Sequence, residues 1–343
     1  MKRFLLPENG TFFKANLHCH STFSDGNLTP EQIKALYQSH GYSIVAFTDH
    51  DILIPHQELR DENFLPLNGL ELEVPDLKDY SNSWHSRKDC HMCLIALEPD
   101  NLVQPCYHRS DYLFRNAVNY RDQIQFDESQ PDYIRTHTPE CVSDMMRRGR
   151  EAGFFVTYNH PTWSYEGYED YINYHGMHAM EIYNHSAYRN GWQEYNPRVY
   201  EDFLQAGRRI YVISADDNHN CTTPDDQHWD SCGGFTMIKA DRLDYRTITR
   251  ALEEGNFYAS QGPEIHALWY EDGQLHITCS PAKRIVCTAG TRHRQARNAG
   301  AGETLTEAVF TLEPDDYYVR FTVIDQQGNC ADTNAYFLDD FYQ

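Results

Sequence analysis

The chain of 343 residues is long enough for one large domain and a smaller one, and its 40% hydrophobic and 13% aromatic residues can supply a substantial core. Its formal net charge of −22 argues against a nucleic-acid polymer as the main partner, because phosphate backbones are bound by basic surfaces. A small phosphorylated ligand is compatible with this charge if bound cations reverse it locally.

The first informative motif lies close to the N-terminus. A predicted strand over residues 12–17 leads into His18-Cys19-His20 and then into a Ser-Asp-Gly turn that contains Asp25. Alternate side chains of a strand point to the same face, so His18 and His20 are expected to converge on one spot. Convergent imidazoles followed by a carboxylate are typical of half a metal site, although a pair of polar loop histidines would give the same pattern.

Helices and strands then alternate along the chain. Helices are predicted over residues 29–41, 138–153 and 196–207, where cap and first-turn proline signals open each segment. A further helix is predicted over about 244–254. Strands are predicted over residues 43–48, 64–70, 91–97, 154–158, 180–183, 209–214, 234–238 and 257–259. Residues 105–138 have only a weak helical pattern and no assigned structure. The alternation predicts an α/β fold with a parallel sheet.

Residue types that bind metals accompany nearly every predicted strand. After His18 and His20 they are Asp49-His50, Glu71, His91, His160 and Asp217 with His219. Each could be an ordinary polar residue by itself, but chance would have to place such residues at the end of strand after strand. Strand ends converge on one point in a barrel, so the pattern favours a closed or nearly closed barrel.

The pattern changes after Gly262. An Asp-Gly turn at 272–273 between two alternating stretches predicts a hairpin, and further strands follow with no helix signal between them. We therefore predict two domains, an α/β barrel over residues 1–262 and a small all-β, sandwich-like domain over residues 263–343.

The expected cellular setting follows from segments that the sequence does not show. The 10 cysteines are scattered rather than spaced as a disulfide framework. Residues 1–8 have basic residues but no apolar segment of a signal peptide, and no run approaches the length of a membrane span. We expect a soluble cytoplasmic protein with reduced thiols and no membrane partner.

Four signatures together resemble the polymerase and histidinol phosphatase (PHP) domain family of metal hydrolases. They are His18-Cys19-His20 with Ser24-Asp25-Gly26, Phe47-Thr48-Asp49-His50, Gly69-Leu70-Glu71 and Asp217-Asn218-His219. The strand containing His91 and the motif Asn159-His160-Pro161 fill the remaining family positions. The resemblance covers roughly residues 12–260 and implies a distorted (β/α)7, TIM-like barrel.

The resemblance also implies two to three divalent transition-metal ions. By analogy, the first ion is bound by His18, His20, Glu71 and Asp217, and the second by Glu71, His91 and His160. The third is expected at His50 and His219 together with Asp25, which stands where some family members have a histidine. Mixed imidazole and carboxylate ligands suit zinc, manganese or iron. Glu71, Asp217 and His160 are the expected catalytic residues, and Asp49 is expected to support the site without binding an ion.

The main functional hypothesis is a metal-dependent phosphoesterase that cleaves a small phosphorylated metabolite by a metal-bridged hydroxide. A branch of the family with similar C-terminal β domains includes carbaryl-hydrolase-like enzymes, so carbamate, amide or ester hydrolysis is the first alternative. A catalytically silent binding module is the second, although the complete ligand set argues against it. Specificity is expected in loops 75–90, 105–136 and 162–178, which contain Trp84, Trp163 and Tyr165.

Overall fold

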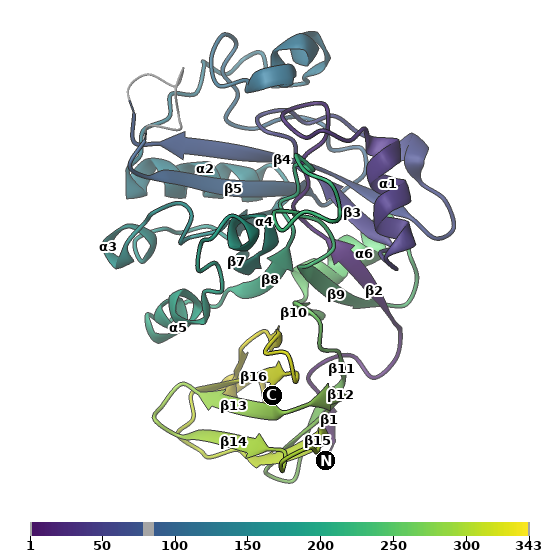
Figure 1. Cartoon of the computed structure of the whole chain (residues 1–343). Helices are drawn as coiled ribbons and strands as arrows, with labels where there is room; N and C mark the ends of the chain where they lie inside the picture. Colours follow the sequence, from purple (N-terminus) through teal and green to yellow (C-terminus); the bar gives the residue numbers. More distant parts are fainter. Residues whose placement is uncertain (1, 78–85, 342–343) are drawn as a thin grey trace.

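The computed structural model describes residues 2–77 and 86–341, so Trp84 lies outside the described residues. Figure 1 shows a larger α/β part above a smaller β part, with both chain ends in the smaller part. Each of the 10 cysteines is free. Within the described ranges, no helix is long and apolar enough to cross a membrane.

One continuous sheet forms the centre of the α/β part. Its strands are β2 (Thr11–Asn16), β3 (Ile44–Phe47), β4 (Leu65–Pro75), β5 (Asp89–Ala96), β6 (Phe154–Tyr158), β7 (Ala179–Asn184), β8 (Tyr211–Ala215), β9 (Phe235–Ala240) and β10 (Phe257–Ser260). Their order in the sheet is β10-β9-β2-β3-β4-β5-β6-β7-β8. Every residue of β3, β4, β5, β6 and β7 is buried, as expected for strands covered on both faces.

The sheet is mixed, so the expectation of a parallel sheet is wrong in part. The pairs β2–β3, β3–β4, β6–β7 and β7–β8 are parallel. However, β5 is antiparallel to both β4 and β6, and β9 is antiparallel to both β2 and β10. Apolar patterning predicts that a buried strand exists but carries no information on its direction.

The last strand in this order, β8, approaches β9 near the other end of the α/β sheet. The Ser214 backbone N–H donates to Thr236 Oγ1 at 3.3 Å, and that hydroxyl donates to the Ser214 carbonyl at 3.0 Å. The described residues show no backbone ladder between β8 and β9. The α/β class and the large sheet agree with the prediction, whereas closure of a (β/α)7 barrel by strand pairing is not observed.

All four predicted helices are present. They are α1 (Pro30–Ser39), α2 (Pro139–Glu151), α5 (Pro197–Gln205) and α6 (Tyr245–Glu253). In α1, the Thr29 side chain accepts from the Gln32 backbone and the Gln32 side chain accepts from the Thr29 backbone, which completes a capping box. Further helical segments are α3 (Tyr168–Tyr171), α4 (His185–Arg189), η1 (Gln57–Leu59), η3 (Arg115–Gln123) and η4 (Leu338–Asp340).

The smaller part consists of strands from both ends of the chain. They are β1 (Arg3–Phe4), β11 (Ile265–Glu271), β12 (Gln274–Ala282), β13 (Arg284–Ala289), β14 (Arg294–Asn298), β15 (Leu305–Thr311), β16 (Tyr318–Ile324), β17 (Cys330–Thr333) and β18 (Tyr336–Phe337). The predicted hairpin is present between β11 and β12, and Asp272 and Gly273 both have positive φ, 47° and 83°, as a two-residue turn of this kind requires.

The two parts share a sheet and a core. Strand β10 pairs with β17, so the α/β sheet continues into β17-β16-β13-β14. Tyr258 of β10 belongs to the same apolar cluster as Phe321 and Leu6. Strand β1 pairs with β11, so the first residues of the chain lie in the β part. The division at residue 262 stays a prediction, and both the sheet and the apolar core continue from one side of residue 262 to the other.

Candidate metal centre

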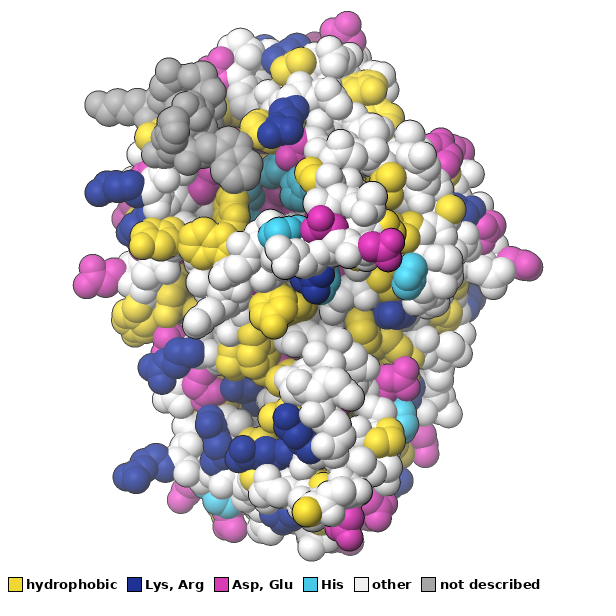
Figure 2. All heavy atoms as spheres, viewed as in Figure 1, with side chains coloured by type: hydrophobic (Ala, Val, Ile, Leu, Met, Phe, Trp, Pro, Cys, Tyr) yellow, Lys and Arg dark blue, Asp and Glu magenta, His cyan; other side chains and the backbone are white. Residues whose placement is uncertain are grey.

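The nine predicted metal ligands gather at one cavity of about 650 Å³. Seven of them line it, namely Asp25, His50, Glu71, His91, His160, Asp217 and His219. His18 and His20 are fully buried and contact Glu71 and Asp217. Figure 2 shows histidine side chains deep in a hollow of the molecular surface.

Two ligand positions differ from the expectation that every ligand follows the end of a strand. Glu71 lies in the middle of β4, which continues to Pro75. His91 lies near the start of β5 and pairs directly with Glu73 of β4. Because β5 is antiparallel to β4, its first residues lie beside the last residues of β4, and His91 thereby reaches the same edge of the sheet as the other ligands.

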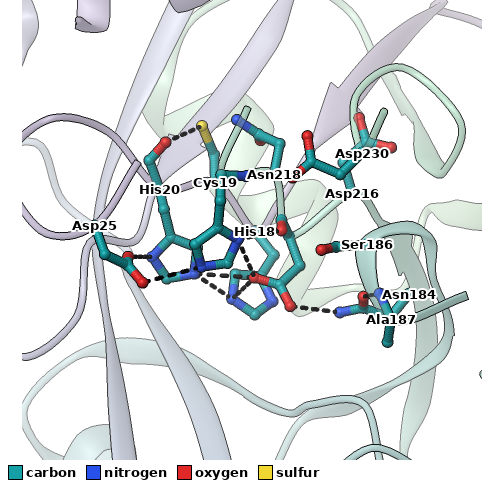
Figure 3. A network of polar contacts seen from close by, with 12 residues as sticks. His18, Cys19, His20, Asp25, Asn184, Ser186, Ala187, Asp216, Asn218 and Asp230 are labelled. Atoms are coloured by element: carbon teal, nitrogen blue, oxygen red, sulfur yellow. Dashed lines mark hydrogen bonds and ion pairs between the residues drawn. The ribbon is translucent and has the colours of Figure 1, made fainter. Parts of the chain in front are cut away.

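The first predicted ion site is the most compact group. The Nε2 atom of His18 lies 3.1 Å from Glu71 Oε1 and 3.2 Å from Asp217 Oδ1. The Nε2 atom of His20 lies 3.3 Å from Glu71 Oε2 and 3.0 Å from Asp217 Oδ1. Figure 3 shows the His18 and His20 side chains meeting beside Asp25. Four ligand-type side chains therefore point at one position.

These spacings fit a bound cation. Neighbouring ligand atoms about 2.0–2.2 Å from a metal ion lie roughly 2.8–3.6 Å from one another in octahedral or tetrahedral geometry. The distances of the first group fall within that range. In the described part of the chain, His20 Nδ1, His50 Nδ1 and both ring nitrogens of His91 are buried without a hydrogen-bond partner. Buried unpaired nitrogens are costly unless an ion binds them, so the residues present fit a metal cluster.

The second predicted site lies where His91 and His160 approach Glu71. Glu71 Oε1 lies 3.1 Å from His91 Nδ1 and 3.4 Å from His160 Nε2. His50 Nδ1 lies 3.3 Å from Glu71 Oε2, so His50 faces this site as well as the predicted third one. Both carboxylate oxygens of Glu71 are therefore surrounded by imidazoles, an arrangement that suits a carboxylate shared between two ions.

The third predicted site is looser. Asp25 Oδ2 lies 3.4 Å from His219 Nε2, and Asp25 Oδ1 lies 4.0 Å from His50 Nε2. His20 Nδ1 also approaches Asp25 Oδ1, at 3.7 Å. His20 thus belongs to this group through one ring nitrogen and to the first group through the other, a sharing that the sequence did not predict.

The comparisons with known proteins agree with the family suggested by the motifs. A model of the PHP domain matches residues 16–256, which is more than half of the chain. The chain belongs to the PHP domain family. No curated protein sequence matches it.

Solved structures similar to this PHP protein share little sequence with it. A two-domain protein of Bacteroides vulgatus that contains a predicted PHP-like metal-dependent phosphoesterase is 15% identical, with a TM-score of 0.46 and coverage of 98% of this chain and 97% of its own. A candidate metal-dependent phosphoesterase of Bifidobacterium adolescentis is 17% identical, with a TM-score of 0.40 and coverage of 73% and 96%. An amidohydrolase of Chromobacterium violaceum with bound sulfate and no metal is 15% identical, with a TM-score of 0.38 and coverage of 71% and 96%.

The acidic residues of this PHP site are held in the ionised form that metal ions need. Burial opposes ionisation of Glu71, but His18, His91 and His50 outweigh it and hold its pKa well below the usual range. Burial likewise disfavours protonation of His219, yet the Asp25 carboxylate overcomes this and raises the pKa of His219 to about 10. Glu71 is therefore available as an anionic ligand, and a bound cation could take the place of the positive charge that His219 supplies beside Asp25.

Glu181 is the most important residue that the sequence analysis missed. It lies in β7, is fully buried, and its Oε1 atom is 2.7 Å from His18 Nδ1. Its Oε2 atom accepts from the His160 backbone N–H and from Asn184 Nδ2, both at 2.9 Å. A carboxylate at Nδ1 places a proton there and leaves the Nε2 lone pair of His18 free for a metal. No motif marked Glu181, because nothing in the sequence shows that β7 faces the His18 ring.

Asp49 occupies the supporting position expected of it. It accepts from the backbone N–H of Ser21 at 2.8 Å and of Ser24 at 3.1 Å. It also accepts from both serine hydroxyls at 2.7 Å. These four hydrogen bonds fix the loop between His20 and Asp25, so Asp49 shapes the site through the loop backbone.

A second acidic group lies on the far side of His91. The His91 Nε2 atom is 3.6 Å from Asp89 Oδ1 and 3.8 Å from Glu73 Oε2. Both carboxyl groups line the cavity and are buried. Neither residue was singled out from the sequence, because their alignment with His91 depends on the antiparallel pairing of β4 and β5.

Proposed function

We propose that this PHP protein is a metal-dependent phosphoesterase that hydrolyses a small phosphorylated molecule. The observation that carries the proposal is the sharing of Glu71 between two compact groups of imidazoles, His18 with His20 and His91 with His160. A carboxylate shared in this way suits neighbouring divalent ions, which when bound supply an acidified water and stabilise charge on phosphoryl oxygens. The mixed N and O donors support zinc, manganese or iron as the two to three ions.

The described side chains prepare the site for such ions. Glu181 orients His18 and fixes the backbone of His160. Asn159 Nδ2 donates to Glu71 Oε1 at 2.9 Å, which holds the shared carboxylate in place. His160 has a φ of 26°, a left-handed conformation that is unusual for a side chain other than glycine and directs the imidazole toward Glu71.

The cavity is suited to a small molecule. At about 650 Å³ it lies within the range of typical ligand pockets. Trp163 packs against the rings of His91 and His160, with centroid distances of 4.9 Å and 4.7 Å. This indole shields one side of the predicted second ion site from water. The acidic charge of the whole chain supports a metabolite as substrate and not a nucleic-acid polymer.

A substrate screen tests the proposal. Protein loaded with manganese or zinc should hydrolyse at least one phosphomonoester or phosphodiester, and chelation should abolish the turnover. The same screen should include carbamates, amides and carboxylic esters. Hydrolysis of those compounds without any phosphoester turnover would overturn the phosphoesterase assignment in favour of the alternative reaction. Metal-independent turnover would contradict the role of the cluster.

A further inference from the structure

The cavity at the predicted metal ligands is lined by one arginine that has no acidic partner among the described residues. Of the residues that the structure describes, three with Lys or Arg side chains line the cavity. Arg87 Nε lies 3.4 Å from Asp76 Oδ2, and Lys88 Nζ lies 2.6 Å from Asp170 Oδ2. For the third, Arg115, no carboxylate of residues 2–77 or 86–341 lies within ion-pair distance. Arg115 is exposed where it lines the cavity, so among the described residues its guanidinium is open to an anionic ligand.

The backbone around Arg115 is fixed to the loop that carries Asp25. The Asn116 backbone N–H donates to the Ser24 carbonyl at 3.1 Å, and Asn116 Nδ2 donates to the Thr22 carbonyl at 3.2 Å. Arg115 itself has a φ of 46°, in the left-handed region that is unfavourable for arginine. Such backbone strain concentrates at functional sites. The anchors place the backbone of Arg115 beside the loop that carries Asp25, and its side chain lines the cavity there.

Arg115 does not reach the same position as the ions. Its guanidinium carbon lies 5.4 Å from the centre of the Phe114 ring. That ring in turn packs edge-on against His50, with a centroid distance of 5.3 Å. Phe114 therefore contacts both the guanidinium and one predicted ligand, His50. A group bound by Arg115 is distinct from a phosphoryl group bound at the ions.

We propose that Arg115 binds a second anionic group of the substrate, so that the preferred substrate is a phosphoester with an additional carboxylate or phosphate. The planar guanidinium matches either group and can bind it with two parallel hydrogen bonds. This assignment rests on the proposed phosphoesterase function and adds the substrate class. Arg115 is then a specificity-determining residue, and Phe114 sets the spacing between the two anionic groups.

Matched aromatic substrates test the assignment with manganese-loaded protein. Phenyl phosphate has one anionic group, whereas 4-carboxyphenyl phosphate and 1,4-phenylene bisphosphate have a second one across the ring. Arg115→Asn removes the charge, and asparagine tolerates the left-handed backbone. We expect this variant to lower kcat/KM about 10- to 100-fold for the two doubly anionic substrates. Turnover of phenyl phosphate should remain within about twofold of the wild-type value.

Two further variants separate charge from geometry. Arg115→Lys keeps the charge without the planar fork, so it should recover part of the preference. Arg87→Ala removes a cavity cation that is already paired with Asp76, and it should leave the ratio of the substrates unchanged. The carboxylate and bisphosphate substrates show which second anion fits better. Equal losses on all three substrates in Arg115→Asn, or no loss on any, would overturn the assignment.

A binding experiment distinguishes failure of this assignment from failure of the proposed function. Phenylphosphonate and 4-carboxyphenylphosphonate are not hydrolysed, and their affinities for the metal-loaded protein can be measured by calorimetry. The carboxyl compound should bind about tenfold more tightly to the wild type, and this gain should vanish in Arg115→Asn. That result without hydrolysis of any phosphoester would refute the phosphoesterase function and retain the Arg115 site. Equal binding of both phosphonates by wild type would refute the Arg115 site.

Discussion

The Nε2 atoms of His18 and His20 lie 3.1 Å apart. At this distance they cannot both carry a proton, because two N–H donors would point at each other. The Glu181 carboxylate, 2.7 Å from His18 Nδ1, holds a proton at that nitrogen and leaves the Nε2 lone pair directed at His20 and Asp217. The pair of histidines is thus arranged around a position for a cation, and this arrangement leads to tests of the individual ligands.

Glu71→Ala should disrupt two ion sites at once. Glu71 contacts both His18 with His20 and His91 with His160, so its loss removes an anionic ligand from each group. We expect the bound metal to fall by about two equivalents and activity to be abolished. Elemental analysis of protein purified without chelator measures the loss. Glu58→Ala, at an exposed glutamate, is the control and should retain the wild-type content. Unchanged metal in Glu71→Ala would contradict the shared-carboxylate arrangement.

Asp25→Ala should affect only the third ion. Its carboxylate approaches His219, His20 and His50 at 3.4–4.0 Å and contacts no ligand of the second site apart from His50. We expect about two ions to remain bound while most turnover is lost, and added manganese should restore part of it. Metal content and rate are measured on the same sample. Asp100→Ala, at an exposed turn residue, serves as the control. Full activity with unchanged metal would show that Asp25 is only a turn residue.

Glu181→Gln should weaken metal binding without removing a ligand. The amide cannot accept at both His18 Nδ1 and the His160 backbone N–H as the carboxylate does. Changes to residues that orient metal ligands typically reduce metal affinity 10- to 100-fold, and we expect about this effect. A competition titration with a chelating dye measures the affinity. Glu201→Gln, which weakens the ion pair with Arg320, controls for a general loss of stability. Equal affinities for wild type and Glu181→Gln would refute the orienting role.

Truncation after residue 262 should give an aggregating protein. The β10–β17 ladder would be lost, and Tyr258 would lose its apolar neighbours in the β part. The Asn334 side chain, which accepts from the Val212 backbone N–H at 2.9 Å, would also be absent. Size-exclusion chromatography checks the outcome, with the full chain as reference. The full chain should resist limited proteolysis near residues 261–264. A monomeric, metal-binding fragment would show instead that the two predicted domains are independent.

Much of the fold and of the site could be predicted from local patterns. Three of the four helices follow from cap-position and first-turn proline signals, and the hairpin at Asp272-Gly273 follows from turn chemistry, because these signals act between residues close in sequence. The ligand motifs, such as His18-Cys19-His20, are equally local, and the family match over residues 16–256 agrees with the resemblance that they suggested. What each ligand binds stays a prediction.

Only the tertiary structure decided the features that depend on strand direction and on contacts distant in sequence. The antiparallel course of β5 brings His91 between Glu71 and the Glu73–Asp89 pair, and apolar periodicity cannot encode that direction. Glu181 meets His18 across 163 positions of sequence, so no motif could connect them. Arg115 lies in a stretch without a clear pattern, and it lines the cavity next to Asn116, which is bound to the distant Thr22–Ser24 loop. The sequence by itself determines the ligand residue types and the local helices and turns, because these depend on neighbouring residues. The long-range pairings form only when the whole chain packs.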